Sequence, residues 1–289
     1  MENRKLGFTF DKDGNPKYKI KGIKKDLYSD LYHHFLTKSW IKVLLAIFIS
    51  SMFVNTIFAS FYMACDGINN ATHWYDYFFF SIQTLSTIGY GFMYPTNLCT
   101  HILVSIQSFL GLLFVSFLTG IVFAKFSLPR AKILYTKNIV IHHDGNDLML
   151  KLRMANKRGN QIIDANIKAV VLKLETLSDG TNFRRIHDLS LLRDRIPMFS
   201  LSFTVQHKID ENSPLFGETH QSLIDKQVIV IITVNGIDES ITQTLVSKYF
   251  YTFEEIQWGM KFKDVLEYDE NGEVFFNYDN FDLLIEEKV

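Results

Sequence analysis

Two long apolar stretches, residues 41–63 and 102–126, constrain this chain more than any other feature. The 289-residue chain carries 30 Lys and Arg, yet none lies between Val43 and Ala124. A bilayer core about 30 Å thick requires about 20 apolar helical residues, so each stretch is long enough to cross it. The sequence therefore predicts two membrane spans.

Polar residues interrupt the first span at Ser50, Asn55 and Thr56. Polar side chains inside spans usually face neighbouring helices. We expect these three to pack against other helices rather than to bind a ligand.

The distribution of basic residues predicts the topology. Ten Lys or Arg lie in residues 1–42, and Lys125, Arg130 and Lys132 follow at the end of the second span. Because cytoplasmic segments carry the excess of positive charge, both termini are expected in the cytoplasm of a multi-pass cell-membrane protein. The first 25 residues are charged and polar, which argues against a cleavable signal peptide.

Residues 26–37 repeat apolar side chains at helical spacing, through Leu27, Leu31 and Phe35. We interpret them as a helix in the membrane interface after a cytoplasmic tail, residues 1–25. An ordinary packed helix is the alternative.

From residue 131 the apolar period changes from 3.6 to 2, as in the alternation of Leu148, Leu150 and Leu152 with Met149, Lys151 and Arg153. Several such strands separated by turn signals predict an antiparallel β-sandwich over residues 131–289. There is no GxGxxG motif, which argues against a dinucleotide-binding domain.

Nothing in the sequence indicates an enzyme or a nucleic-acid-binding protein. The nine His are scattered without metal-ligand spacing, and no catalytic constellation is visible. The net charge of −1 gives no indication of nucleic acid as a partner. We therefore expect no cofactor and no catalytic residues.

Between the spans, an aromatic-rich segment precedes Thr87-Ile88-Gly89-Tyr90-Gly91. Two glycines around an aromatic residue allow consecutive carbonyls to point the same way. The motif is similar to the TVGYG filter of potassium channels, where carbonyl oxygens replace the hydration shell of the ion. Residues 75–91 are thus expected to form a pore helix and filter.

The chain resembles the inward-rectifier potassium channels, most closely their prokaryotic KirBac branch, from about Asp26 to the C-terminus. Matching segments include residues 78–84, 119–126, 129–133, 186–189, 209–219 and 256–259. The resemblance implies a homotetramer with a slide helix (residues 26–37), a two-span pore domain (residues 38–130) and a cytoplasmic immunoglobulin-like β-sandwich. It also places the chain under the broad heading of voltage-gated channels.

The resemblance implies that carbonyls of Thr87, Ile88, Gly89 and Tyr90, with the Thr87 hydroxyl, hold K⁺, which permeates passively. Gly91 completes the filter.

Gln83, Thr84, Phe92 and Met93 would support the filter. Eukaryotic relatives carry Glu and Arg at the positions of Gln83 and Met93, and KirBac relatives commonly carry Asp at that of Phe92. The neutral residues here predict altered filter stability or weaker attraction of cations at the outer mouth. Harmless, compensated drift is the alternative.

On the second span, Phe123 matches the bulky residue at the inner gate, where core packing is the rival interpretation. Gly111 and Gly120 serve either as hinges of a bending helix or as close packing points. Val115 lies at the cavity position that controls rectification, and a neutral residue there predicts weak block by Mg²⁺ or polyamines. Asp164 and Glu239 match acids lining the cytoplasmic pore, or are ordinary surface carboxylates.

The juxtamembrane cations are Lys38, Lys42, Lys125, Arg130 and Lys132. Each basic residue near an anionic leaflet is worth about 1 kcal/mol. The resemblance implies that they face anionic lipids, whereas topology alone is the alternative.

Cys65 and Cys99 flank the pore loop on the outer side, where eukaryotic relatives carry a bridging pair. An oxidising exterior permits a disulfide, and two free thiols are the alternative.

Together these features predict a tetrameric K⁺ channel gated at the inner helix bundle by its cytoplasmic domain and by lipids. A weakly selective cation channel and a non-conducting, membrane-anchored β-sandwich binding protein are the alternatives.

Overall fold

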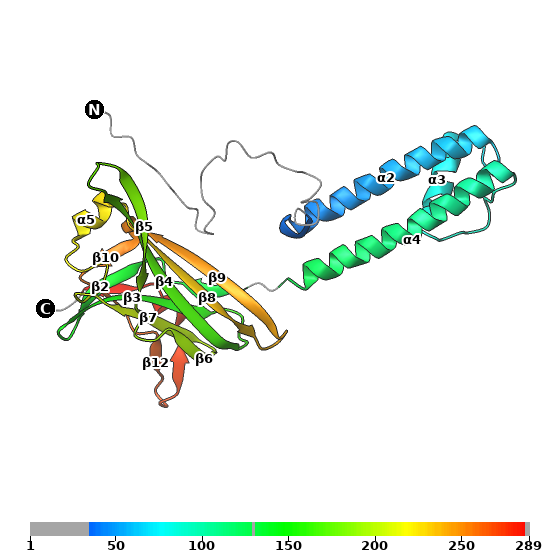
Figure 1. The fold of residues 1–289 in the computed structure, drawn as a ribbon. Coiled ribbons are helices and arrows are strands. Elements are labelled where there is room, and N and C mark those ends of the chain that lie inside the picture. The colour runs from blue at the N-terminus through cyan, green and yellow to red at the C-terminus, as the bar shows by residue number, and fades with distance from the viewer. Residues whose placement is uncertain (1–34, 129–130, 287–289) are drawn as a thin grey trace. The chain divides into compact units, whose positions relative to one another are not determined.

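The computed structural model describes residues 35–128 and 131–286, which form two compact units (Figure 1). We call residues 35–128 the helical unit and residues 131–286 the β unit. The division falls where the sequence changes from apolar spans to alternating strands. The expected tail, residues 1–25, and most of the expected interfacial helix lie outside the described residues. Of that helix, only residues 35–37 are described, and they are helical.

Three helices build the helical unit: α2 (Trp40–Cys65), α3 (Trp74–Leu85) and α4 (Leu98–Phe126). Helices α2 and α4 are each long and apolar enough to cross a membrane. Helix α2 extends the first predicted span by one residue at its start and two at its end, whereas α4 begins four residues before the second predicted span and ends with it. The short helix α3 packs against both of them and occupies the position predicted for a pore helix.

Each helix of this unit has an identifiable end signal. Helix α2 stops at Asp66, which adopts the left-handed region at φ 43° and donates its N–H to the last turn. At the start of α3, the carboxylate of Asp76 accepts hydrogen bonds from the N–H groups of Thr72 and His73. Asn97 caps α4 by accepting from the N–H of Thr100.

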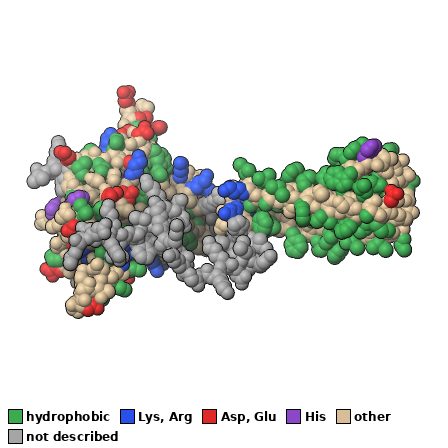
Figure 2. All heavy atoms as spheres, turned by 90° about the horizontal axis from the view of Figure 1, so that it is seen from above, with side chains coloured by type: hydrophobic (Ala, Val, Ile, Leu, Met, Phe, Trp, Pro, Cys, Tyr) green, Lys and Arg blue, Asp and Glu red, His purple; other side chains and the backbone are tan. Residues whose placement is uncertain are grey.

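The surface of the helical unit is apolar over most of its length. Figure 2 shows hydrophobic side chains covering the face of this unit in view. Only 17% and 11% of the most apolar windows of α2 and α4 are buried within one chain. These helices are therefore not the core of a soluble domain, and their exposed apolar faces need lipid or further protein to cover them.

The β unit consists of two five-stranded sheets packed face to face. The first has the order β1-β3-β2-β10, with β7 on the other edge of β3. The second has the order β5-β4-β8-β9, with β6 also pairing β4. The strands of the first sheet are β1 (Ile133–Tyr135), β2 (Ile139–Asp144), β3 (Asp147–Asn156), β7 (Ser202–Lys208) and β10 (Ile256–Trp258). Those of the second are β4 (Ile162–Thr176), β5 (Asn182–Leu189), β6 (Arg195–Phe199), β8 (Ile229–Asp238) and β9 (Gln243–Thr252).

The sandwich is antiparallel, as predicted, except that β10 pairs β2 in parallel. Its core lies between the sheets and includes Ile139 and Leu152 from one side and Val171 and Ile232 from the other. Short elements complete the unit: helix α5 (His220–Asp225), the turns η1 (Phe253–Glu255) and η2 (Tyr278–Asn280), and the ribbons β11 (Met260–Phe262) with β14 (Leu284–Glu286) and β12 (Leu266–Tyr268) with β13 (Val274–Phe276).

Strand β3 is buried on both faces, which its alternating sequence does not predict. Arg153, expected on a solvent face, is only 9% exposed. Its guanidinium donates to the carbonyl of Lys263 and lies over the ring of Phe262. The C-terminal ribbons therefore cover the outer face of this strand.

A charged cluster fastens the segment between β7 and α5 to the second sheet. The carboxylate of Glu218 accepts hydrogen bonds from Lys226 at 2.6 and 2.8 Å, Lys173 at 3.3 Å and Ser222 at 2.6 Å. The side chains of Glu218 and Lys173 are only 7% and 11% exposed. Burial opposes the charge of Glu218, but these hydrogen bonds outweigh it, so the pKa of Glu218 is lowered.

We expect Glu218→Gln to destabilise the β unit by about 3 kcal/mol, because it leaves a nearly buried ammonium without its counter-charge. Thermal unfolding of the solubilised full chain and hydrogen exchange in residues 213–226 would measure this. A lowered folded-state pKa means that the stabilisation is present above the ordinary carboxyl range and is lost as pH falls through the lowered value. The variant should lack this acid dependence.

The control is Asp147→Asn, which breaks a solvent-exposed pair with Lys208. That change should cost at most about 1 kcal/mol. If the two substitutions lowered the free energy of unfolding equally, the Glu218 cluster would contribute no more to stability than an exposed ion pair.

Candidate conduction site

The loop after α3 has a backbone that alternates in handedness. Thr87, Gly89 and Gly91 have φ values of 57°, 57° and 83°, whereas Ile88 and Tyr90 between them do not have positive φ. Alternation of this kind turns successive carbonyl groups toward one side of the chain. Glycine meets this requirement at two of the three left-handed positions without the penalty that a Cβ imposes.

The first two amides of the loop are held by the pore helix. Thr87 N–H donates to the carbonyl of Thr84 at 3.1 Å, and Ile88 N–H donates to that of Gln83 at 2.8 Å. The position of the loop therefore depends directly on the position and rotation of α3.

The four predicted support residues act mostly through backbone atoms or apolar packing. Gln83 contributes the carbonyl just described, and the hydroxyl of Thr84 donates to its own helix at Phe80. The carbonyl of Phe92 accepts from the amide of Asn70 at 2.9 Å. Met93 packs against the apolar cluster between α2 and α3.

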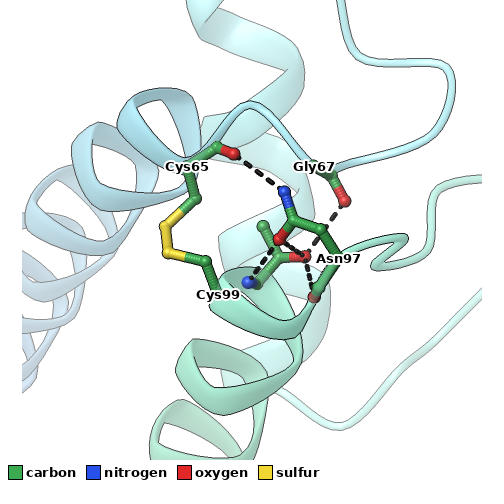
Figure 3. Close-up of a disulfide and its surroundings, with 5 residues drawn as sticks. Cys65, Gly67, Asn97 and Cys99 are labelled. Carbon is green, nitrogen blue, oxygen red and sulfur yellow. Dashed lines mark hydrogen bonds between the residues drawn. A yellow bond between two sulfur atoms is a disulfide. The ribbon is translucent and has the colours of Figure 1, made fainter.

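The C-terminal end of α2 and the N-terminal end of α4 are tied together by a disulfide and hydrogen bonds (Figure 3). A disulfide joins Cys65 and Cys99, whose Cα atoms are 5.9 Å apart. The amide of Asn97 donates to the carbonyl of Cys65 at 2.9 Å, and the hydroxyl of Thr100 donates to the carbonyl of Gly67 at 3.1 Å. A Cβ at Gly67 would meet the Asn97 side chain at 2.2 Å, so this close approach requires glycine.

The two glycines of α4 differ in surroundings. A Cβ at Gly111 would lie 2.4 Å from the carbonyl oxygen of Leu85, at the end of the pore helix. At Gly120 there is no heavy atom within 4 Å among the described residues. Close packing therefore accounts for Gly111, whereas the contacts of this chain give no packing role to Gly120.

Val115 and Phe123 both project from α4 into space left open by a single chain. Val115 is 52% exposed and Phe123 is 72% exposed. Neither belongs to the apolar cores found in the described part of the chain. Both positions are therefore free to meet other copies or a central pathway.

The juxtamembrane cations fall into two groups. Lys38, Lys42 and Lys132 are exposed, and Arg130 lies outside the described residues. Lys125 differs from the sequence-based expectation, because it is only 4% exposed. Its position turns it inward rather than toward lipid.

The ammonium of Lys125 lies at the end of the helical unit where α2 begins and α4 ends. It donates to the carbonyls of Phe35, Leu36 and Lys38 at 3.1, 3.0 and 2.5 Å and lies 5.5 Å from the ring centre of Trp40. A cation at the C-terminal carbonyls of a helix is favoured both by hydrogen bonding and by the helix dipole. Lys125 thus links the end of α4 to the segment that precedes α2.

In the β unit, Asp164 and Glu239 lie at the same end of the second sheet. Asp164 occupies a bulge of β4 at φ 52°, and Glu239 follows β8, with its N–H bonded to the carbonyl of Gln161. Asp164 is paired with Arg195, whose Nε is 2.5 Å from the carboxylate. This pair raises the pKa of Arg195 and offsets the negative charge of Asp164.

Sequence reasoning missed Arg195, which is 31 residues away from its partner. It expected Asn55 to pack against other helices, but it did not predict the cluster of four buried polar side chains to which Asn55 belongs, although polar residues inside apolar spans are a recognisable signal. They are Asn55, Tyr62, Ser81 and Gln107.

The fold and the loop geometry define a two-span membrane protein with a pore loop and a β-sandwich domain. The family model for the inward rectifier potassium channel transmembrane domain matches residues 10–129, and that for the C-terminal domain matches residues 133–288. The chain therefore belongs to the inward rectifier potassium channel family. It is a membrane channel and not an enzyme.

Individual relatives agree with this assignment. The inward rectifier potassium channel Kirbac3.1 of Paramagnetospirillum magnetotacticum is 37% identical over 257 residues, which cover 88% of this chain and 87% of the relative. ATP-sensitive inward rectifier potassium channel 12 of Gallus gallus is 30% identical over 213 residues, covering 71% of this chain and 49% of the relative. The chain thus matches about half the length of that animal channel. Because the matching family and relatives are inward rectifiers, the expected assignment to the voltage-gated channels is not supported.

We expect Lys125→Met to loosen the residues before α2 whether or not anionic lipid is present. The change keeps the side-chain length but removes three charge-assisted hydrogen bonds, so amides of residues 38–43 should exchange at least about tenfold faster. Hydrogen exchange in bilayer discs of neutral and of anionic lipid would measure this. The matched control is Lys42→Met, at an exposed position; an effect of Lys125→Met confined to anionic discs would mean that Lys125 acts through lipid.

Proposed function

We propose that four copies of this chain form a K⁺ channel in which the carbonyls of Thr87, Ile88, Gly89 and Tyr90, with the Thr87 hydroxyl, replace the ion's hydration shell. The observation that carries this proposal is the alternating backbone from Thr87 to Gly91. A single chain supplies one row of carbonyls, whereas an ion is surrounded only when several rows face one axis.

The exposed surfaces of a single chain support assembly around such an axis. Tyr90 and Phe92 are 76% and 68% exposed beside the filter, and Phe123 projects at the far end of α4. Large apolar side chains at these positions gain most by packing against further copies. Three identical partner subunits would supply that contact.

The arrangement of charge supports insertion in the inner membrane with both termini on the cytoplasmic side, since basic residues flank the spans and are absent between them. The disulfide between Cys65 and Cys99 would then face the oxidising exterior. Anionic lipids would meet the exposed Lys38, Lys42 and Lys132.

Block by Mg²⁺ or polyamines should be weak in this channel. Val115 supplies no charge to the cavity, and Arg195 offsets the charge of Asp164. Only Glu239, of the two predicted acids, keeps a carboxylate for which no ion pair is found in the described residues. A multivalent cation therefore finds little negative potential along these positions.

A weakly selective cation channel is the second candidate. The observation favouring it is the neutral chemistry at Gln83, Phe92 and Met93, where charged residues would attract cations or brace the filter. Competition between K⁺ and Na⁺ separates the two candidates.

We expect purified protein in liposomes to take up ⁸⁶Rb⁺ in a manner that Ba²⁺ blocks and that K⁺, but not Na⁺, suppresses. Gly89→Ala should abolish uptake, because a Cβ at φ 57° costs about 1–2 kcal/mol in each subunit and disturbs the carbonyl row. Gly145→Ala is the control, since Gly145 has φ 64° in a turn of the β unit. Uptake suppressed equally by Na⁺ would favour the weakly selective channel. No uptake by the native chain in any lipid would leave the non-conducting interpretation.

We expect Phe123→Ala to increase basal ⁸⁶Rb⁺ uptake several-fold, because a ring of four phenyl groups can close a pathway by excluding water. Phe117→Ala, at a similarly exposed residue of α4, should leave basal uptake unchanged. Equal leak in the native and Phe123→Ala channels would place the gate elsewhere.

A further inference from the structure

Four polar side chains meet inside the helical unit: Asn55 and Tyr62 from α2, Ser81 from α3 and Gln107 from α4. Each side chain is at most 1% exposed even in a single chain, so no further subunit is needed to bury the cluster. In a bilayer there is no water to satisfy such groups, so polar residues here must pair with one another. They are the point at which all three helices make polar contact.

The amide of Gln107 is the centre of the cluster. Its Nε2 donates to the hydroxyl of Ser81 at 2.7 Å and to the carbonyl of Ser81 at 3.1 Å. Its Oε1 accepts from the hydroxyl of Tyr62 at 2.6 Å. The Ser81 hydroxyl in turn donates to Asn55 at 2.9 Å, and the Asn55 amide donates to the carbonyl of Ser51 at 2.9 Å.

These partners fix the orientation of the Gln107 amide. Reversing it would direct Oε1 at the carbonyl oxygen of Ser81, placing two acceptors against each other. The donor must therefore face α3, and the acceptor must face α2. The cluster defines one rotation of α3 between its neighbours.

That rotation bears directly on the filter. Ser81 lies on the same short helix as Gln83 and Thr84, whose carbonyls hold the first two filter amides. Gly111, one turn after Gln107 on the same face of α4, makes a second contact at the end of α3 through the carbonyl of Leu85. Helix α4 therefore contacts the pore helix at two points, through Gln107 and through Gly111.

We propose that Gln107 is a positioning residue that sets the ion selectivity of the channel by holding the pore helix through Ser81. This inference rests on the proposed function of residues 87–91 as a filter. Gln107 does not contact the ion; it acts through Ser81 and then through the carbonyls of Gln83 and Thr84.

Apolar packing alone would not have this effect. Interhelical hydrogen bonds in bilayers add little stability beyond packing, but they are directional. Buried polar contacts are best attested as devices that fix register rather than as sources of strength. A bulky apolar residue at position 107 would fill the space while leaving α3 free to rotate.

The test is Gln107→Met, which keeps the length of the side chain and removes all four of its hydrogen bonds, including a longer one of 3.4 Å from Nε2 to Asn55. In the ⁸⁶Rb⁺ uptake assay, we expect the preference for K⁺ over Na⁺ as competitor to fall roughly tenfold, with the tetramer still assembled. Ser105→Ala is the matched control, because Ser105 is exposed on α4 and, among the described residues, its hydroxyl bonds to its own helix at His101 alone. It should keep native selectivity.

Two further variants keep the test decisive if Gln107→Met fails to assemble. Ser81→Ala and Tyr62→Phe each remove a hydroxyl of the cluster and should lower selectivity in the same direction by a smaller factor. Ser81→Ala combined with Gln107→Met should be no worse than Gln107→Met alone. Native selectivity in these variants would overturn the inference, even if flux or yield fell. A native chain that fails to discriminate K⁺ from Na⁺ would instead overturn the proposed function.

Discussion

An unpaired backbone N–H or C=O in hydrocarbon costs several kcal/mol, and the helical unit is arranged around that constraint. Helices α2 and α4 satisfy their own backbones. The loop between α3 and α4 cannot, and is tolerated only where it lines a cavity or lies against protein. Its first amides bond to carbonyls of α3, and near its end Thr96 donates its N–H to the carbonyl of Gly67 at 2.7 Å. A non-helical loop is therefore possible here because a short helix holds one end and the disulfide-bonded ends of α2 and α4 hold the other.

The features predicted from sequence were those with a local signal. Span length, the glycines at positions 89 and 91, and the two-residue period of the strands each lie within a few consecutive residues, and they define the pore loop and the sandwich. The missing parts depend on contacts between distant residues. Arg153 is covered by ribbons that begin more than 100 residues later, and the sequence of neither segment predicts the contact.

The charged residues show the same limitation more sharply. A match to a family position identifies the type of residue, but the groups that the residue contacts determine its electrostatic effect. The ammonium of Lys125 donates hydrogen bonds to the carbonyls of Phe35, Leu36 and Lys38, and the carboxylate of Asp164 forms an ion pair with Arg195. Neither charge is free in the sense that a sequence comparison assumes, because an ion pair or a capped helix end has already reduced its field at longer range.

Neutral groups also account for how the proposed filter can be held without a charged pair behind it. The position expected to carry a carboxylate holds Gln83, and its expected basic partner is Met93, which packs in the apolar cluster. The constraint on α3 then comes from the amide of Gln107, the hydroxyls of Ser81 and Tyr62, and the glycine contact at position 111. Amides and hydroxyls of this kind stay neutral as the pH falls, whereas a carboxylate paired with a cation is neutralised by acid. Hydrogen-bonded support of the proposed filter would therefore be weaker electrostatically than an ion pair, but it is directional and does not depend on protonation.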